Sequence, residues 1–227
     1  MYGHARATDI GDFGDNRRVV LSREDLEQSQ LYSEALGIGL ASVREEAVFA
    51  WFLASQLYGG RIAESIAERT FAVFAAEQLL SPGAIIAAGR EHLINPVMRR
   101  GGYVRYDNRK VDQILRACHT IVEDYAGRTT GLHEAAADAP DLETRVKAIY
   151  GIGPVTANIF LRELRPFWAK ADPAPLPVVV DLAGVLGIDL GGYDRKSLLF
   201  ARVEAGLMRH RRQLEWRIET PRGSART

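Results

Sequence analysis

The sequence predicts an all-α fold of about ten helices, on two observations. Apolar residues recur with the 3.6-residue period of an amphipathic helix through most of the 227 residues, and capping residues stand where several of these segments begin. Alternating strand patterns are almost absent, and the short run Val178–Val180 is the one extended segment that we expect.

Capping signals mark the helix starts in the first half of the chain. Ser22–Asp25 is typical of a capped start, and Ser42–Glu45 reads as a capping box before a helical apolar stripe. Ser81–Pro82 places a cap and an N1 proline before a short helix that Gly89 can end.

The strongest single helix signal lies in the middle of the chain, from about Asn108 to Ala126. Its apolar residues form one stripe, and Gly127 is suited to the position after its last turn. Cys118 belongs to this stripe, so we expect it to pack as a small buried residue.

The second half begins with two further helices and a loop. Asp141 can cap a helix that halts at Gly151, and another helix follows from Pro154 to Leu164. Four prolines between Pro166 and Pro177 predict a loop, in which we expect packing to account for Phe167 and Trp168 rather than a ligand pocket.

After this loop the pattern predicts that Asp181 caps a helix through about Leu186. Asp194 then opens one or two more helices. Residues 1–20 and 220–227 carry no such pattern, and we expect both tails to be poorly ordered.

Composition excludes several classes of protein. The 29 basic and 29 acidic residues cancel, which argues against a protein that coats nucleic acid through bulk charge. The single cysteine excludes an internal disulfide and any cluster with several thiolate ligands. No segment is typical of a membrane span or a secretory signal, so we expect a cytoplasmic, nucleoid-associated protein.

Basic residues are nevertheless unevenly distributed. Six lie between Arg99 and Arg116 against two acidic residues, and nine follow from Arg195 onward against three. These clusters suit a ligand held on one face, and they equally suit solvated helix surface. The run Arg209–Arg212 carries the same two interpretations, phosphate contact or solvated surface.

The most specific local pattern is the run Ile149–Asn158 between two helical segments. Gly151 and Gly153 flank one apolar residue, which permits a turn too tight for side chains. Pro154 suits the first position of the following helix, whose free amides form a phosphate-binding arrangement. An ordinary αα-hairpin is the alternative, and the flanking helices and the later segment ending in Asp181 favour the DNA-binding interpretation.

Four segments of the chain, taken in order, resemble a known superfamily. The run Gly151-Ile-Gly-Pro-Val-Thr-Ala-Asn158 resembles the helix-hairpin-helix signature of the DNA glycosylases that include endonuclease III, the adenine mismatch glycosylase and 3-methyladenine glycosylase. Arg105–Cys118 is similar to the loop and helix before that hairpin, Phe52–Gln56 to the helix ending in a DNA-contacting glutamine, and Val178–Asp181 to the segment ending in the catalytic aspartate.

The resemblance implies a particular chemistry. Asp181 occupies the position of the carboxylate that stabilises positive charge on the sugar as the base leaves; capping its helix is the alternative role, and it can have both. Val155 stands where members that also cleave the strand have a nucleophilic lysine. The resemblance therefore implies a monofunctional enzyme without lyase activity. It implies no iron–sulfur cluster, because only Cys118 is available, and it leaves open a monovalent or divalent cation at the hairpin turn.

The resemblance also implies a DNA-contacting set. Tyr106 falls at the position of the wedge residue and Gln56 at that of the glutamine that enters the same gap; either can instead be ordinary surface. The implied DNA-contacting residues are Gly151, Gly153, Val155, Thr156, Gln56, Tyr106, Arg105 and Asn108.

Together these observations predict a monomeric base-excision-repair enzyme that acts on a damaged or mispaired base in double-stranded DNA. We expect one lobe from residues 21–40 plus 141–219, carrying the hairpin and Asp181, and a second from residues 41–140. The alternatives are a helix-hairpin-helix DNA-binding protein without catalysis, and a helical scaffold that binds protein. The target base stays open, because pocket shape decides it.

Overall fold

The computed structural model describes residues 21–60 and 62–211, and the tails predicted at residues 1–20 and 220–227 lie outside them. The prediction of an all-α fold is confirmed, because the described residues form helices and no strand. The helix content also agrees with the expected number of about ten, although several of these helices have five residues or fewer.

The elements of the first half are α1 (Arg23–Glu27), α2 (Tyr32–Ala35), α3 (Glu45–Tyr58), α4 (Glu64–Ala76), α5 (Pro82–His92), a π-helical stretch η1 (Leu93–Met98) and α6 (Arg99–Gly101). Those of the second half are α7 (Asp107–Tyr125), α8 (Gly131–Ala135), α9 (Ala139–Ala148), α10 (Pro154–Leu164), α11 (Pro177–Leu186), a 3-10 turn η2 (Leu190–Gly192) and α12 (Leu198–Arg209).

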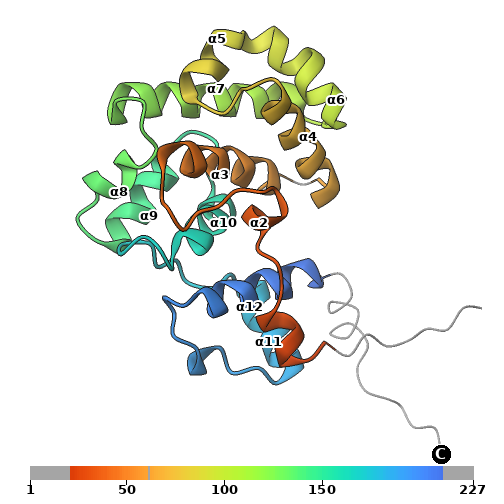
Figure 1. Ribbon diagram of the computed structural model, residues 1–227, viewed down its shortest axis with the longest axis vertical. Coiled ribbons are helices and arrows are strands. Elements are labelled where there is room, and N and C mark those ends of the chain that lie inside the picture. The colour runs from red at the N-terminus through yellow and green to blue at the C-terminus, as the bar shows by residue number, and fades with distance from the viewer. Residues whose placement is uncertain (1–20, 61, 212–227) are drawn as a thin grey trace, which may run out of the picture.

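The helices form three layers along the long axis of the molecule (Figure 1). One layer holds α4 to α7, with α5 packed on α7. The middle layer holds α2, α3 and α8 to α10. The last layer holds α11 and α12 together with α1. Helix α1, the first helix of the described residues, packs on α12, the last.

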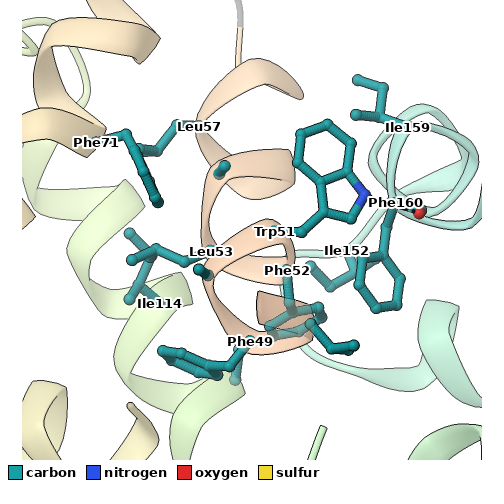
Figure 2. Packing of buried hydrophobic residues seen from close by; sticks show 14 of the residues in the cluster. Phe49, Trp51, Phe52, Leu53, Leu57, Phe71, Ile114, Ile152, Ile159 and Phe160 are labelled. Atoms are coloured by element: carbon teal, nitrogen blue, oxygen red, sulfur yellow. Dashed lines mark hydrogen bonds between the residues drawn. The ribbon is translucent and has the colours of Figure 1, made fainter. Parts of the chain in front are cut away.

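Helix α3 lies at the centre of the larger hydrophobic core and is apolar on every face. Its residues from Val48 to Leu57 are all buried, as expected of a helix surrounded by others. Figure 2 shows Leu53 facing Ile114 of α7, while Trp51 faces α10 on the other side. The Trp51 indole N–H donates to the Phe160 carbonyl at 3.0 Å, so α3 and α10 are joined by a hydrogen bond as well as by apolar contact.

A smaller core joins α1, α11 and α12, with Leu26, Leu182 and Phe200 among its buried members. The larger core continues from α3 across residue 140 into α9 and α10. Hydrophobic packing therefore marks no boundary at residue 140, and the two predicted lobes stay a prediction.

The predicted starts of α3 and α9 are wrong. Helix α3 begins at Glu45 with Arg44 at the N-cap and no side-chain cap, so Ser42 forms no capping box. The Glu45 carboxylate instead accepts hydrogen bonds from the Thr129 and Thr130 amides, at 2.7 and 2.9 Å. Helix α9 is capped by Asp138, three residues before the predicted Asp141. At α9 a second polar residue, Asp138, takes the capping role, whereas no side chain caps α3.

The predicted extended run Val178–Val180 is also wrong. These residues form the first turn of α11, and Leu176 rather than Asp181 is the N-cap. Val179 and Leu182 face the smaller core, and this packing outweighs the strand preference of a valine run. Other local predictions are confirmed: Ser22 and Ser81 cap their helices, Cys118 is buried, and Trp168 packs against Phe160.

Candidate functional site

The predicted hairpin lies between α9 and α10. Ile149 and Ile152 are buried, and the Ile152 amide donates to the Ile149 carbonyl at 3.0 Å to close the turn. Gly151 has φ of +84°, and a Cβ at this position would lie 2.5 Å from Cγ of Gln113 on α7. Glycine is therefore required twice at position 151, by the backbone conformation and by the close approach of α7.

The other end of the turn is open. Gly153 is the N-cap of α10, has φ of −85°, and has nothing within 4 Å of where a Cβ would be. Pro154 and Val155 are exposed beside it, and no side chain caps this helix. The first turn of an α-helix directs its unpaired amides outward, so the start of α10 is a positively polarised surface open to an anion.

Exposed aromatic and basic side chains lie just before this turn and at the start of α7. Tyr150 is 50% exposed, and the guanidinium of Arg116 lies 4.4 Å from its ring centroid. Tyr106 is 56% exposed, has a left-handed backbone with φ of +65°, and has the guanidinium of Arg105 5.0 Å from its ring. Sequence reasoning missed Tyr150 and Arg116, although Tyr150 directly precedes Gly151.

Asn108 and Gln56 are less available than predicted. The Asn108 side chain accepts from Arg90 and donates to Asp107, so its polar groups are already engaged. Gln56 is 2% exposed, and its side-chain oxygen has no hydrogen-bond partner in the described chain. The Gln56 amide would have to leave this position to enter DNA. A buried acceptor without a partner makes such a departure less costly.

Lys110 joins the start of α7 to the end of α3. Its Nζ donates to the Gln56 carbonyl at 2.8 Å, and burial, reinforced by Arg109, lowers the pKa of its amine to about 8. The C-terminal end of a helix attracts a cation, which explains how the charged form is retained there. Lys110 therefore holds the loop carrying Tyr106 against α3.

A cavity of about 740 Å³ lies beside the start of α10. Its walls come from α2, the end of α3, the start of α4, one face of α10 and the end of α12. Val155 lines it and is also part of the exposed first turn of α10. Thr156 is buried next to Val155, against Gly59, where a Cβ would overlap the threonine hydroxyl. This close contact between α3 and α10 fixes the hairpin to the cavity wall.

Tyrosine hydroxyls and charged groups line the cavity. The Tyr32 hydroxyl donates to Glu64 at 2.8 Å, and Tyr58 lies close by with its ring 4.9 Å from that of Tyr32. Burial raises the pKa of both tyrosines well above the usual value, so both hydroxyls stay protonated. Arg162 of α10 and Arg209 of α12 both lie over the Tyr32 ring. Glu64 is the carboxylate among the lining residues.

Asp181 lies in the second turn of α11 with its side chain exposed, and it is not among the residues that line the cavity. The structure thus brings the hairpin glycines, Val155 and the cavity together, and leaves Asp181 on a neighbouring helix. Sequence reasoning missed Arg162, yet a signal was present: Val155, Ile159 and Arg162 share one face of α10, and an arginine there interrupts an apolar run.

Comparison of the chain with known protein families, with characterised proteins and with solved structures finds no match to any of them. Within the described residues no three His, Cys, Asp or Glu side chains are placed to hold a metal ion. In the same residues, no helix has both the length and the apolar character needed to cross a membrane. A function for this chain is therefore inferred from the sequence resemblance and from the geometry of the site.

Proposed function

We propose that the protein is a monofunctional DNA glycosylase of base excision repair, which binds double-stranded DNA through the hairpin and hydrolyses the bond between one base and its sugar. The observation that carries the proposal is that Val155 belongs both to the exposed start of α10 and to the lining of the 740 Å³ cavity. A DNA strand bound at the start of α10 would place a flipped nucleotide beside the cavity.

The start of α10 supports binding to the DNA backbone. Its outward amides and helix dipole favour a phosphate, and Gly153 leaves room for the phosphate to approach. Exposed Arg116 and Arg105 lie on the neighbouring α7 and the loop before it. Contacts of this kind hold the strand without reading its sequence, as a repair enzyme requires when a lesion can occur anywhere.

The cavity supports base recognition. Its volume falls within the range of about 300–1,000 Å³ that is usual for small-molecule sites, and aromatic and hydrogen-bonding side chains line it. Tyr106, half exposed at the start of α7, is positioned on an adjoining loop, where a flat ring can stack on the base left without a partner.

The chemistry that fits these residues is direct hydrolysis. The bond between C1′ and the nitrogen of the nucleobase breaks, and its electron pair leaves with the nucleobase. A water oxygen forms the new bond to C1′, and the water proton passes to a proton-accepting side chain or to solvent. Val155 supplies no amine for a covalent intermediate, and Lys110 is engaged with Gln56. A carboxylate that stabilises the positive sugar is therefore the one catalytic group required, and we assign this role to Asp181.

The test of the reaction is the release of free base from duplexes that each carry one lesion or mismatch, with alkali used to reveal abasic sites. We expect Asp181→Asn to abolish base release while leaving DNA affinity largely unchanged, and Asp124→Asn, at the far end of α7, to behave like the parent. Full activity of Asp181→Asn would contradict the assignment. Full activity of Asp181→Asn, together with loss of activity in Glu64→Gln, would instead assign the carboxylate role to Glu64 at the cavity wall.

The second candidate is a DNA-binding protein without catalysis. The position of Asp181 outside the lining of the cavity favours it. Absence of base release from every duplex, combined with affinity for DNA that falls steeply with added salt, would establish this alternative. Affinity for duplex DNA that is insensitive to salt would contradict both candidates and would favour a helical scaffold.

A further inference from the structure

Arg162 is a buried cation with unused hydrogen-bond donors. Its side chain is 1% exposed and lines the cavity, and its Nε and Nη1 have no hydrogen-bond partner among the described residues. An arginine keeps its charge in any protein environment, and a buried donor without an acceptor costs about 1–3 kcal/mol, more when it is charged. Two such donors at a cavity wall indicate a site made for an acceptor.

The nearest carboxylate does not fill this role. Nη2 of Arg162 lies 3.6 Å from Glu163 Oε1, which balances charge without forming a hydrogen bond. The Glu163 oxygens already accept from the amides of Tyr32 and Ser33, at 3.0 and 2.8 Å, and in this way hold α2 against α10. Glu163 is therefore a structural partner of α2, and the buried Nε and Nη1 of Arg162 are left without an acceptor.

The surrounding charges favour the same class of ligand. Among the described residues, Arg162 and Arg209 line the cavity together with the carboxylate of Glu64, so the charges of this wall do not attract a cationic ligand. Glu64 is itself engaged, because it accepts from the Tyr32 hydroxyl and lies 3.9 Å from Arg209. The face of Tyr32 carries guanidinium groups at 4.1 and 5.5 Å, which leaves it less able to stack on a cationic ring.

We infer that the cavity selects bases whose edge carries carbonyl oxygens, as deaminated and oxidised bases do, and rejects purines made cationic by alkylation, with Arg162 as the residue that determines this specificity. The inference rests on the proposed function for the identity of the ligand as a base. The physical basis is the placement of unpaired arginine donors at the cavity wall, beside a tyrosine ring whose face already carries guanidinium groups. A carbonyl oxygen accepts from such donors, and a ring nitrogen with an added alkyl group does not.

The experiment compares duplexes that carry uracil or an oxidised pyrimidine with duplexes that carry 3-methyladenine, a cationic alkylated purine without a carbonyl oxygen, in single-turnover base release by the full chain. We expect the parent to favour the carbonyl-bearing bases and Arg162→Met to lose about tenfold or more of that preference, the effect of one or two charged hydrogen bonds. Arg202→Met is the control, because this arginine pairs with Glu34 away from the cavity. Because a ratio of rates is measured, a loss of folded protein cancels.

A parent protein that favours 3-methyladenine, or a preference that is unchanged in Arg162→Met, would overturn the inference while leaving glycosylase activity in place. If no duplex releases a base, the same comparison is made by affinity, with duplexes whose 2′-fluorinated sugar prevents cleavage. An Arg162-dependent affinity for the carbonyl-bearing base would then support the inference although the proposed function had failed. Equal affinities in parent and variant would overturn it.

Discussion

At the scale of single residues, the described chain buries polar groups where helix ends meet. Arg165 forms a fully buried ion pair with Glu204 and also donates to the Pro173 carbonyl at 2.7 Å, so it ties α10, α12 and the proline-rich loop together. Lys110 ties α7 to α3 in a similar way. Such groups cost free energy to bury, and their benefit is that they fix which helix ends meet.

Lys110 leads to a prediction about pH. Burial lowers the pKa of its amine from 10.5 to about 8, so between these values the unfolded chain binds a proton that the folded protein has released. Raising the pH across this range therefore stabilises the folded state, by at most about 3 kcal/mol. We expect this gain to be absent in Lys110→Met.

The measurement is urea unfolding of the parent and of Lys110→Met, once at neutral pH and once near the upper limit of this range. The free energy of unfolding of the parent should increase relative to that of the variant as the pH rises. Other titrating groups are present in both proteins, so their contribution cancels in this difference. A difference between the two proteins that does not change with pH would contradict the assignment of the lowered pKa to Lys110.

At the scale of elements, the hairpin separates two functions of glycine. Gly151 is required by the fold, because it combines a positive φ with close contact to Gln113. Gly153 could carry a side chain, because its φ is negative and nothing lies within 4 Å of where a Cβ would be. We propose that a DNA phosphate occupies this open space. The two positions are two residues apart in one turn, so they form a matched pair.

We expect Gly151→Ala to destabilise the protein by about 1–3 kcal/mol, from left-handed strain and overpacking, and Gly153→Ala to change stability by less than about 1 kcal/mol. Affinity for undamaged duplex DNA should fall in Gly153→Ala, because the new methyl group occupies the phosphate position. Thermal unfolding and fluorescence titration with DNA give the two readings. Unchanged affinity in a stable Gly153→Ala protein would remove the hairpin from the DNA interface.

At the scale of the whole molecule, the cavity depends on both cores. The larger core holds α3 and α10, whereas α12, which supplies Arg209, is held mainly by α1 in the smaller core. The contact between α1 and α12 is close: a Cβ at Gly206 would lie 2.9 Å from Cδ2 of Leu26. The N-terminal helix therefore positions a wall of a site to which it contributes no side chain.

We expect Leu26→Ala to cost about 2–5 kcal/mol, as for other fully buried leucines, and to loosen α12 before α3 and α10. Hydrogen exchange should show faster exchange of amides in α11 and α12, with the amides of α3 and α10 little affected. Exchange that accelerates equally in all these helices would indicate one cooperative unit in place of two.

The fold class and the hairpin could be predicted from sequence because their signals are local. The period of α7, the caps Ser22 and Ser81, and the turn from Gly151 to Pro154 depend on contacts between residues a few positions apart. The start of α11 could not, since a run of valines becomes helical here only when Val179 packs on another helix.

The sequence by itself determined an all-helical chain with a glycine turn that opens a helix to an anion, and it located the residues of that turn. Only the tertiary structure decided that the turn borders a cavity, that Gln56 is buried, that Asp181 stands outside the cavity lining, and that Arg162 faces the cavity with unpaired donors. The physical reason is that a cavity is bounded by segments far apart in the chain, and its position depends on how helices pack, which no local pattern of residues records.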